Sequence, residues 1–471
     1  MEEYLSKGIE KYEAKNGIGI IMKVQTGEIM AMAGISDQDK HKSAANLRSL
    51  PDMPVSFMFE PGSTLKPFTA LIAIENRLFK PDDMIDCRDY HLENRIITDA
   101  HEHDFRKLSF KDIIAYSSNV GISKIVEKIG NEKLYNCLLG FGFGHKTGSN
   151  IYGESDGIFR KMKDWQGFSL HSISFGQEIS VTALQLCNAY CALANDGKIL
   201  RPYIVGEIRD EQNKIVRSFS PQVLRNISNR KSLNTLKDFL QGVVDYGTAK
   251  NLKMEYLSIA GKTGTAEKAI DGAYSEDKYT AVFAGFFPVK QPQYAMVIVY
   301  DEPDYESYAY YSTVSAVPTF KNIVQKLLHL PKCDIISEIK ENRSEFISMP
   351  NLMDLKKKKA QKLLEKNGIK YNIIENDPAG LVVNQFPKQN VNFDKNEIVQ
   401  VIIDIKKTTR TESKITNEMP DLVGLTVKNA LKISKRNKIK LNIVGKGIVS
   451  WQSIPKNSRI TYGEQCKIRA K

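Results

Sequence analysis

The chain has 471 residues, of which 42% are hydrophobic and 26% are charged, and this is enough for one large core together with smaller modules. Its formal net charge of +12 at pH 7 suits an anionic partner. We expect no nucleic acid partner, because the sequence has neither zinc-finger spacing nor an aromatic RNA-binding motif, and much of its lysine excess lies in the C-terminal third.

The start of the chain and its cysteines set two further limits. Residues 1–15 are polar, and no run there approaches the ~20 apolar residues of a membrane span or the shorter apolar core of a signal peptide. None of the six cysteines pairs with another at the two-residue gap typical of metal ligands. Cysteine usage therefore does not decide the redox compartment.

The first 330 residues are predicted to mix strands and helices. A hairpin is expected over residues 17–24 and 28–34, because two strand-like runs flank Gln25-Thr26-Gly27. Helices then predominate, and the sequence favours them over residues 110–116, 120–129 and 181–194. Three strand-like runs lie between residues 257 and 300, and a closing helix is predicted over 319–330. This order indicates an α+β domain with an antiparallel sheet over residues 1–330.

The C-terminal part of the chain repeats itself. Met349-Pro350-Asn351-Leu352 and Met419-Pro420-Asp421-Leu422 each precede a helix-like stretch and then strand-like runs. We therefore predict two small modules, residues 349–405 and 419–471. The intervening segments, residues 331–348 and 406–418, are predicted to be linkers.

Three short polar motifs can together form a site for serine acyl transfer. They are Ser63-Thr64-Leu65-Lys66, Ser117-Ser118-Asn119 and Lys262-Thr263-Gly264. A hydroxyl is a poor nucleophile at neutral pH, so it needs a base within hydrogen-bond reach. A lysine three residues further along a helix lies on the same face, and Ser63 and Lys66 would therefore be neighbours.

Each motif alone is weak, because the same letters recur elsewhere. Ser-x-x-Lys also begins at residues 228, 275, 337 and 453, and Lys-Thr-Gly recurs at 146–148. Context favours Ser63, since Pro61-Gly62 precedes it and apolar residues follow at helical spacing. Lys262 lies on the first strand of a predicted antiparallel meander. Gly264 would there let a substrate backbone approach closely.

In order and context, these motifs resemble those of class B high-molecular-mass penicillin-binding proteins, which are peptidoglycan D,D-transpeptidases. The resemblance is carried by residues 23–33, 59–68, 115–121, 174–182 and 260–267, and it covers about residues 1–330. It implies the penicillin-binding, serine β-lactamase-like fold. The two C-terminal modules resemble PASTA modules. The usual membrane anchor and N-terminal pedestal are missing, so we expect a fragment, an engineered chain or a mis-assigned start.

The resemblance also implies residue roles. Ser63 would be the nucleophile, Lys66 its general base, with a pKa lowered by burial and by the charge of Lys262, and Ser117 a proton relay. The backbone N–H groups of Ser63 and Thr265 would form the oxyanion hole. Substrate binding would fall to Asn119, Lys262, Thr263, Gly264 and Thr265.

The implied substrates are peptidoglycan stem peptides, one supplying D-Ala-D-Ala and the other an acceptor amine, and β-lactam antibiotics would acylate the same serine. Other proteins of cell-wall synthesis are expected partners, at the extracytoplasmic face of the cytoplasmic membrane. We expect no cofactor and no metal, although His101, His103 and Asp104 with Asp99 have the donor types of a metal site. The alternatives are a β-lactam sensor or scaffold without turnover, and a serine β-lactamase or D,D-carboxypeptidase.

Overall fold

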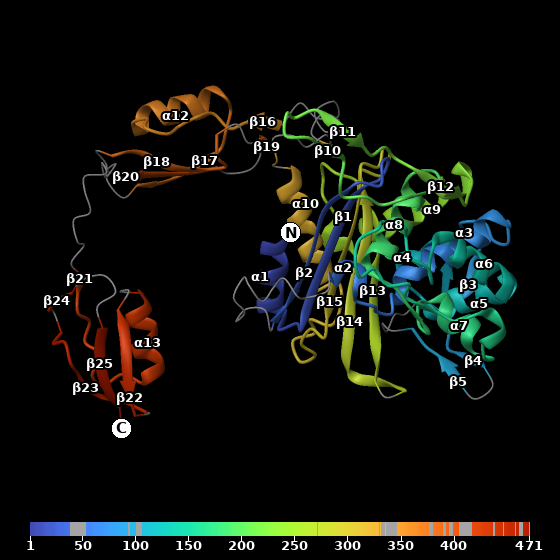
Figure 1. Ribbon diagram of the computed structural model, residues 1–471, viewed down its shortest axis with the longest axis horizontal. Helices are drawn as coiled ribbons and strands as arrows, with labels where there is room; N and C mark the ends of the chain where they lie inside the picture. Colours follow the sequence, from blue (N-terminus) through green and yellow to red (C-terminus); the bar gives the residue numbers. More distant parts are fainter. Residues whose placement is uncertain are drawn as a thin grey trace. The chain divides into compact units, whose positions relative to one another are not determined.

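A computed structural model describes residues 1–37, 53–92, 95–99, 106–270, 272–328, 330, 335, 346–375, 380–389, 392–394, 399–404, 417–436, 439–445, 447–456, 458–460 and 465–470 (Figure 1). The chain forms two compact units. The first comprises Met1–Asn351 with Pro387–Glu397, and the second comprises Leu352–Phe386 with Ile398–Lys471. Among the described residues, no helix is both long enough and apolar enough to cross a bilayer.

A five-stranded antiparallel sheet forms the centre of the first unit. Its strand order is β13-β14-β15-β1-β2, so the hairpin from the start of the chain joins the three strands near residue 300. The strands are β1 (Asn16–Lys23), β2 (Ile29–Ser36), β13 (Ala260–Ile270), β14 (Ala273–Phe287) and β15 (Tyr294–Asp301). Both the predicted α+β class and the antiparallel sheet are confirmed.

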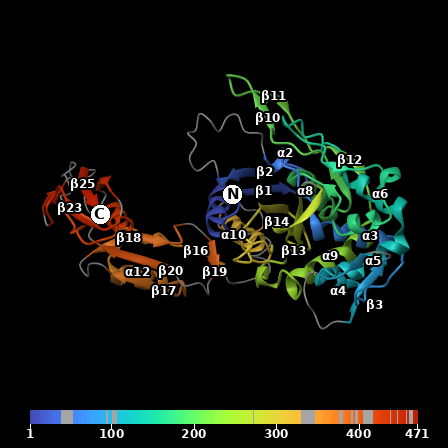
Figure 2. The same ribbon diagram turned by 90° about the horizontal axis from the view of Figure 1, so that it is seen from below.

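Helices cover both faces of this sheet (Figures 1 and 2). All twelve residues of α8 (Ala183–Ala194) are buried where it packs on β1, β14 and β15. The other face is covered by α1 (Glu2–Tyr12) and α10 (Ala316–Leu328), which meet at the buried ring of Tyr300. This double cover explains why every residue of β15 is buried and why that strand reads as a continuous apolar run.

The helical block beside the sheet surrounds α3 (Lys66–Glu75), whose residues are buried from Lys66 to Ala73. The Phe68 ring anchors α3, since it makes edge contacts with the rings of Phe141, at 4.5 Å, and Phe143, at 5.3 Å. The other helices of this block are α4 (Phe110–Ala115), α5 (Asn119–Ile129), α6 (Asn131–Phe141), α7 (Ser169–Ser174) and α9 (Arg230–Asp245).

The sequence predicted α4, α5, α8 and α10 but missed α9. Its buried residues include Leu233, Leu236, Leu240 and Val243, which recur at the helical spacing that would have revealed it.

Short elements connect these larger ones. They are α2 (Met53–Ser56), η3 (Gly62–Leu65), β3 (Met84–Asp86), β4 (Tyr90–Leu92), β5 (Arg95–Ile97), β6 (Lys107–Ser109), β7 (Ile158–Phe159), η4 (Met162–Asp164), β8 (Ile179–Ser180), β9 (Lys198–Leu200), β10 (Glu207–Arg209), β11 (Ile215–Ser218), β12 (Val223–Asn226) and η5 (Lys250–Leu252).

The C-terminal repeat is visible as two equivalent folds. Each has one helix and a three-stranded sheet in which the middle strand pairs in parallel with one neighbour and antiparallel with the other. In both, a buried glutamine side chain accepts the backbone N–H of the leucine that closes the Met-Pro-Asx-Leu motif: Gln385 from Leu352 and Gln452 from Leu422, each at 2.7 Å.

The elements of the first repeat are β16 (Phe346–Ser348), α12 (Lys357–Lys366), β17 (Tyr371–Glu375), β18 (Leu381–Phe386), β19 (Asn392–Asp394) and β20 (Val399–Asp404). Those of the second are β21 (Asn417–Glu418), α13 (Val427–Arg436), β22 (Lys440–Val444), β23 (Val449–Gln452), β24 (Arg459–Ile460) and β25 (Gln465–Ala470). The small strand β16 pairs with β19, and β21 pairs with β24. β16 and β21 occupy the last residues of the two predicted linkers.

Candidate active site

Ser63 lies in η3, a four-residue stretch of 3₁₀ helix that leads directly into α3. The backbone N–H of Lys66 donates to the carbonyl of Ser63, so the two residues close one turn of this helix. Side chains three residues apart in a 3₁₀ turn stand on the same side. The sequence predicted this helix start, and the structure has it; the hydrogen bonds that the Lys66 ammonium makes go to the second motif rather than to Ser63 Oγ.

The Lys66 side chain is fully buried and points at the second motif. Its ammonium donates to the carbonyl of Ser117 at 2.5 Å, to Ser117 Oγ at 3.3 Å and to Asn119 Oδ1 at 2.7 Å. Burial lowers the pKa of Lys66 to about 7, against the opposing effects of Asp99 and Cys87. A large share of Lys66 is therefore neutral near pH 7, the form that a general base requires.

A local backbone feature turns Ser117 toward Lys66. Ser117 has a φ of +66°, the left-handed conformation, and it lies between the ends of α4 and α5. Ser118 then caps α5, since its hydroxyl accepts the Gly121 N–H at 2.9 Å. The strained residue and the cap together present both the hydroxyl and the carbonyl of Ser117 to one ammonium.

Asp99 supports this motif, a role that the sequence did not reveal. Its carboxylate accepts from Ser118 Oγ at 2.7 Å and from the Val120 N–H at 3.0 Å, at the N-terminus of α5. The sequence offered Asp99 only as a metal ligand beside residues 101–104, which lie outside the described residues. Within the described residues, no cluster of three or more His, Cys, Asp or Glu side chains could hold a metal.

The third motif lies on β13, the edge strand of the sheet. Lys262 is fully buried, and its ammonium donates to the carbonyl and hydroxyl of Thr263 at 3.1 and 3.2 Å. Burial lowers the pKa of Lys262 well below its ordinary value, and the Lys66 ammonium lowers it further. The sequence predicted that burial and the charge of Lys262 would both lower the pKa of Lys66. Burial does lower it, and the repulsion between the two buried ammonium groups disfavours their being charged together.

Gly264 makes room for the chain itself. A Cβ atom at this position would lie 2.7 Å from the Pro61 carbonyl oxygen and 2.9 Å from Thr64 Cγ2. The missing side chain therefore lets the turn of residues 61–64, which carries Ser63, pack against β13. We predicted that this glycine would admit a substrate backbone; the structure shows that the Pro61–Thr64 turn fills that space.

A pocket of about 600 Å³ brings five of the predicted residues together: Ser63, Ser117, Asn119, Thr263 and Thr265. Lys66, Lys262 and Gly264 are not in its lining. Lys66 instead reaches the pocket through Ser117 and Asn119, and Lys262 reaches it through Thr263. Because β13 is an edge strand, one row of its backbone groups is available to a ligand.

Aromatic residues form much of the pocket's remaining wall. The ring of Tyr310 lies 4.6 Å from that of Tyr279 and 4.2 Å from that of Tyr311, and all three line the pocket. Phe168, Phe175 and Tyr274 line it as well. Sequence reasoning did not assign these residues to the site, because they come from separate parts of the chain and show no common spacing.

A serine–lysine pair at a helix start, beside the edge strand of an antiparallel sheet, is the arrangement of a serine acyl-transfer domain. Residues 17–325 match the family of the penicillin-binding protein transpeptidase domain. The chain belongs to this family. Residues 347–405 and 417–469 both match the PASTA domain, so the resemblance of the two modules is confirmed as well.

Relatives of the chain are found among cell-wall proteins. Penicillin-binding protein PbpB of Mycolicibacterium smegmatis is 32% identical over 67% of this chain and 50% of its own. The probable peptidoglycan D,D-transpeptidase PenA of Neisseria gonorrhoeae is 30% identical over 70% of this chain and 54% of its own. Stage V sporulation protein D of Bacillus subtilis is 27% identical over 86% of this chain and 63% of its own. The chain thus spans about half the length of the first two relatives.

Solved structures show the same fold. Penicillin-binding protein 3 of Mycobacterium tuberculosis in complex with ampicillin is 28% identical, with a TM-score of 0.63 over 69% of this chain and 74% of its own. The transpeptidase domain of penicillin-binding protein 3 from Burkholderia pseudomallei is 27% identical, with a TM-score of 0.60 over 69% and 92%. The predicted fold is confirmed.

Proposed function

We propose that this protein is a peptidoglycan D,D-transpeptidase that works through an acyl-enzyme on Ser63. The observation that carries the proposal is the fully buried Lys66, whose pKa of about 7 and hydrogen bonds to Ser117 and Asn119 suit a base beside a nucleophile. Family membership and the D,D-transpeptidase name of the relative PenA support it.

In the first half-reaction, Ser63 Oγ attacks the carbonyl of the penultimate D-alanine, and its proton passes to Lys66 Nζ. The backbone N–H groups of Ser63 and Thr265 stabilise the resulting oxyanion, an effect worth about 3 kcal/mol per donor. Ser117 relays the proton from Lys66 to the departing amine. The amide bond breaks, the terminal D-alanine leaves, and an ester to Ser63 remains.

In the second half-reaction, the amine of a neighbouring stem peptide attacks that ester. A new amide forms, and the proton returns through Lys66 to Ser63. Asn119 holds the amide of the substrate, while Thr263 and Thr265, backed by Lys262 and Gly264, bind its carboxylate end. The broken amide supplies the free energy, so the reaction needs no nucleotide. This suits work at the extracytoplasmic face of the membrane, with other cell-wall synthesis proteins as partners.

We also propose a division of the chain. Residues 1–330 form the catalytic domain, and residues 349–405 and 419–471 form the two PASTA modules, joined by the linkers 331–348 and 406–418. The family matches over 17–325, 347–405 and 417–469 support this division, and they start each module two residues earlier, within β16 and at the start of β21.

The test is labelling with a fluorescent penicillin, followed by mapping of the modified peptide. We expect one label on Ser63, its loss in Ser63→Ala, and its retention in Ser453→Ala, a control that removes another serine of the Ser-x-x-Lys pattern. Label on Ser63→Ala, or on another serine of the wild type, would contradict the assignment.

A second assay separates the transpeptidase from its alternatives. Unlabelled protein is given a stem peptide ending in D-Ala-D-Ala together with an amine acceptor, and the products are identified by mass spectrometry. A transpeptidase yields the new amide with release of D-alanine. Hydrolysis of the peptide would indicate a carboxypeptidase, rapid turnover of penicillin a β-lactamase, and no product at all a sensor.

A further inference from the structure

Ser63 lies in η3 (Gly62–Leu65), the nucleophile turn of the proposed function. The segment that leads into this turn runs antiparallel beside residues 176–181. Phe59 and Val181 exchange two backbone hydrogen bonds of 3.0 and 2.9 Å, and the Gly62 N–H donates to the Gly176 carbonyl at 3.1 Å. The contact is very close, because a Cβ atom on Gly176 would lie 2.0 Å from the Gly62 carbonyl oxygen. The segment from Phe59 to Gly62, which ends at the first residue of η3, is therefore held by its neighbour at both ends.

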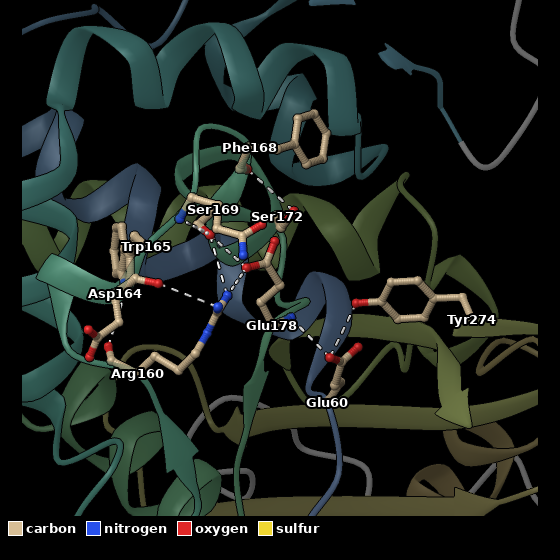
Figure 3. Close-up of polar contacts among 10 residues, drawn as sticks. Glu60, Arg160, Asp164, Trp165, Phe168, Ser169, Ser172, Glu178 and Tyr274 are labelled. Carbon is tan, nitrogen blue, oxygen red and sulfur yellow. Dashed lines mark hydrogen bonds and ion pairs between the residues drawn. The ribbon is translucent and has the colours of Figure 1, made fainter. Parts of the chain in front are cut away.

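Between these ends, Glu178 interrupts the ladder. It has a φ of +59°, its backbone N–H bonds to a side chain instead of to the facing backbone, and Pro61 in the facing segment has no N–H to offer. The Glu60 side chain fills the gap, since its Oε1 accepts the Glu178 N–H at 2.9 Å. The hydroxyl of Tyr274, on β14, donates to the same oxygen at 3.3 Å (Figure 3). One carboxyl oxygen thus joins three segments.

Glu178 extends these connections to a further wall. Its carboxylate pairs with Arg160 and accepts from Ser169 Oγ at 2.7 Å, and Ser169 Oγ also accepts the Gln166 N–H at 3.0 Å (Figure 3). Phe168, which lines the pocket, lies between these bonded residues. Glu60 is therefore linked directly to Tyr274 on β14. Through Glu178 it is also linked to the loop that contains Phe168.

We propose that Glu60 is a positioning residue for Ser63, because its carboxyl oxygen ties the nucleophile turn to two walls of the pocket. The inference rests on the proposed function of Ser63 as the nucleophile. Glu60 itself does not line the pocket; it acts through the turn in which Ser63 lies, only three residues further along the chain.

The surroundings of Glu60 indicate which property of the carboxyl matters. Its second oxygen, Oε2, is buried and has no hydrogen-bond partner within the described part of the chain. Burial raises the pKa of Glu60 to about 7, and the charges of Glu178 and Glu267 add to this, while the hydrogen bonds from Glu178 and Tyr274 oppose it. Both the neutral and the ionised form keep Oε1 as an acceptor. The acceptor, rather than the charge, should therefore position the turn.

The test measures acylation by a chromogenic β-lactam under single-turnover conditions, which separates the dissociation constant of the first complex from the acylation rate constant. We expect Glu60→Ala to lower the acylation rate constant about tenfold or more, because small displacements of a nucleophile are costly, with a much smaller change in the dissociation constant. Glu60→Gln keeps an acceptor oxygen and should retain a rate within about threefold of the wild type.

Tyr274→Phe provides an independent variant. It should lower the same rate constant about threefold alone but add little to Glu60→Ala, since both changes remove one shared contact. Tyr246→Phe is the matched control, because it removes a hydroxyl–carboxylate bond of 3.0 Å to Asp112 away from the pocket. Its acylation rate should be unchanged.

Four results would overturn the inference. The first is an unchanged acylation rate constant in Glu60→Ala, and the second is an equal loss of rate in Glu60→Ala and Glu60→Gln. The third is additive losses of rate in the variant that combines Glu60→Ala with Tyr274→Phe. The fourth applies if Glu60→Ala does not fold, and it is an unchanged rate in Tyr274→Phe. Failure of the wild type to be acylated would instead reject the proposed function. Amide hydrogen exchange would then still test whether Glu60 holds the nucleophile turn against its neighbour. Peptides spanning 59–66 and 174–181 should exchange faster in Glu60→Ala, or in Tyr274→Phe, than in Glu60→Gln. Equal exchange rates would refute this structural role of Glu60.

Discussion

The pH dependence of acylation tests the role of Lys66 directly. With a pKa of about 7, half of Lys66 is neutral at that pH, whereas about one lysine in 3,000 would be neutral at the ordinary value of 10.5. Burial thus raises the share of the base form by about a thousandfold. The acylation rate constant should rise about tenfold between pH 6 and pH 8, as the neutral form increases from about a tenth to about nine tenths, and then level off.

The assay is the single-turnover reaction with a chromogenic β-lactam between pH 5.5 and 9.5. Glu60 also titrates near this range, so the profile is repeated with Glu60→Gln, which removes that carboxyl but should leave the midpoint in place. Lys66→Met should abolish acylation. A rate that continues to rise tenfold per pH unit above pH 8, or a midpoint that follows Glu60, would refute the assignment of Lys66 as the base.

Three further predictions concern single substitutions. Asp99→Asn should move the midpoint of that profile to lower pH, because the Asp99 charge raises the pKa of Lys66; a shift to higher pH would contradict this. Gly264→Ala should lower the free energy of unfolding by about 1–3 kcal/mol and slow acylation, since the new Cβ meets the nucleophile turn. Gly206→Ala, where the added Cβ meets nothing within 4 Å, is the control for thermal unfolding. Gln452→Ala should destabilise the second PASTA module by about 2–4 kcal/mol, because it removes three hydrogen bonds of a buried side chain; calorimetry of the full chain would show an unchanged transition if this is wrong.

Local periodicity allowed the sequence to predict the start of α3 and the position of Ser63 one turn before Lys66. The partners of Lys66 were harder to predict, since Ser117 faces it only through a left-handed backbone conformation that a serine rarely adopts. The contacts of Glu60 were not predictable from spacing, because Tyr274 is more than 200 residues away in the chain. The helix α9, by contrast, was overlooked although its apolar pattern was visible.

The prediction for Gly264 was wrong for an instructive reason. A glycine on a strand signals that something approaches closely, but the sequence does not say what. A substrate was the natural choice beside a motif of this kind, whereas the approaching group is the turn that carries Ser63. Gly176 has the same task on the other side of that turn. One glycine on β13 and one in the 176–181 segment therefore leave room for the turn that carries Ser63.

Lys66 has a consequence for stability that separates function from packing. Folded Lys66 releases its proton near pH 7, and unfolded Lys66 near 10.5, so the unfolded chain holds more protons at this residue between these values. The free energy of unfolding therefore rises with pH across that window and is lowest below it. A buried methionine would carry no such dependence. With lysine at position 66 the fold is therefore less stable at neutral pH than it would be with methionine there. What the lysine provides in exchange is a neutral amine next to Ser117.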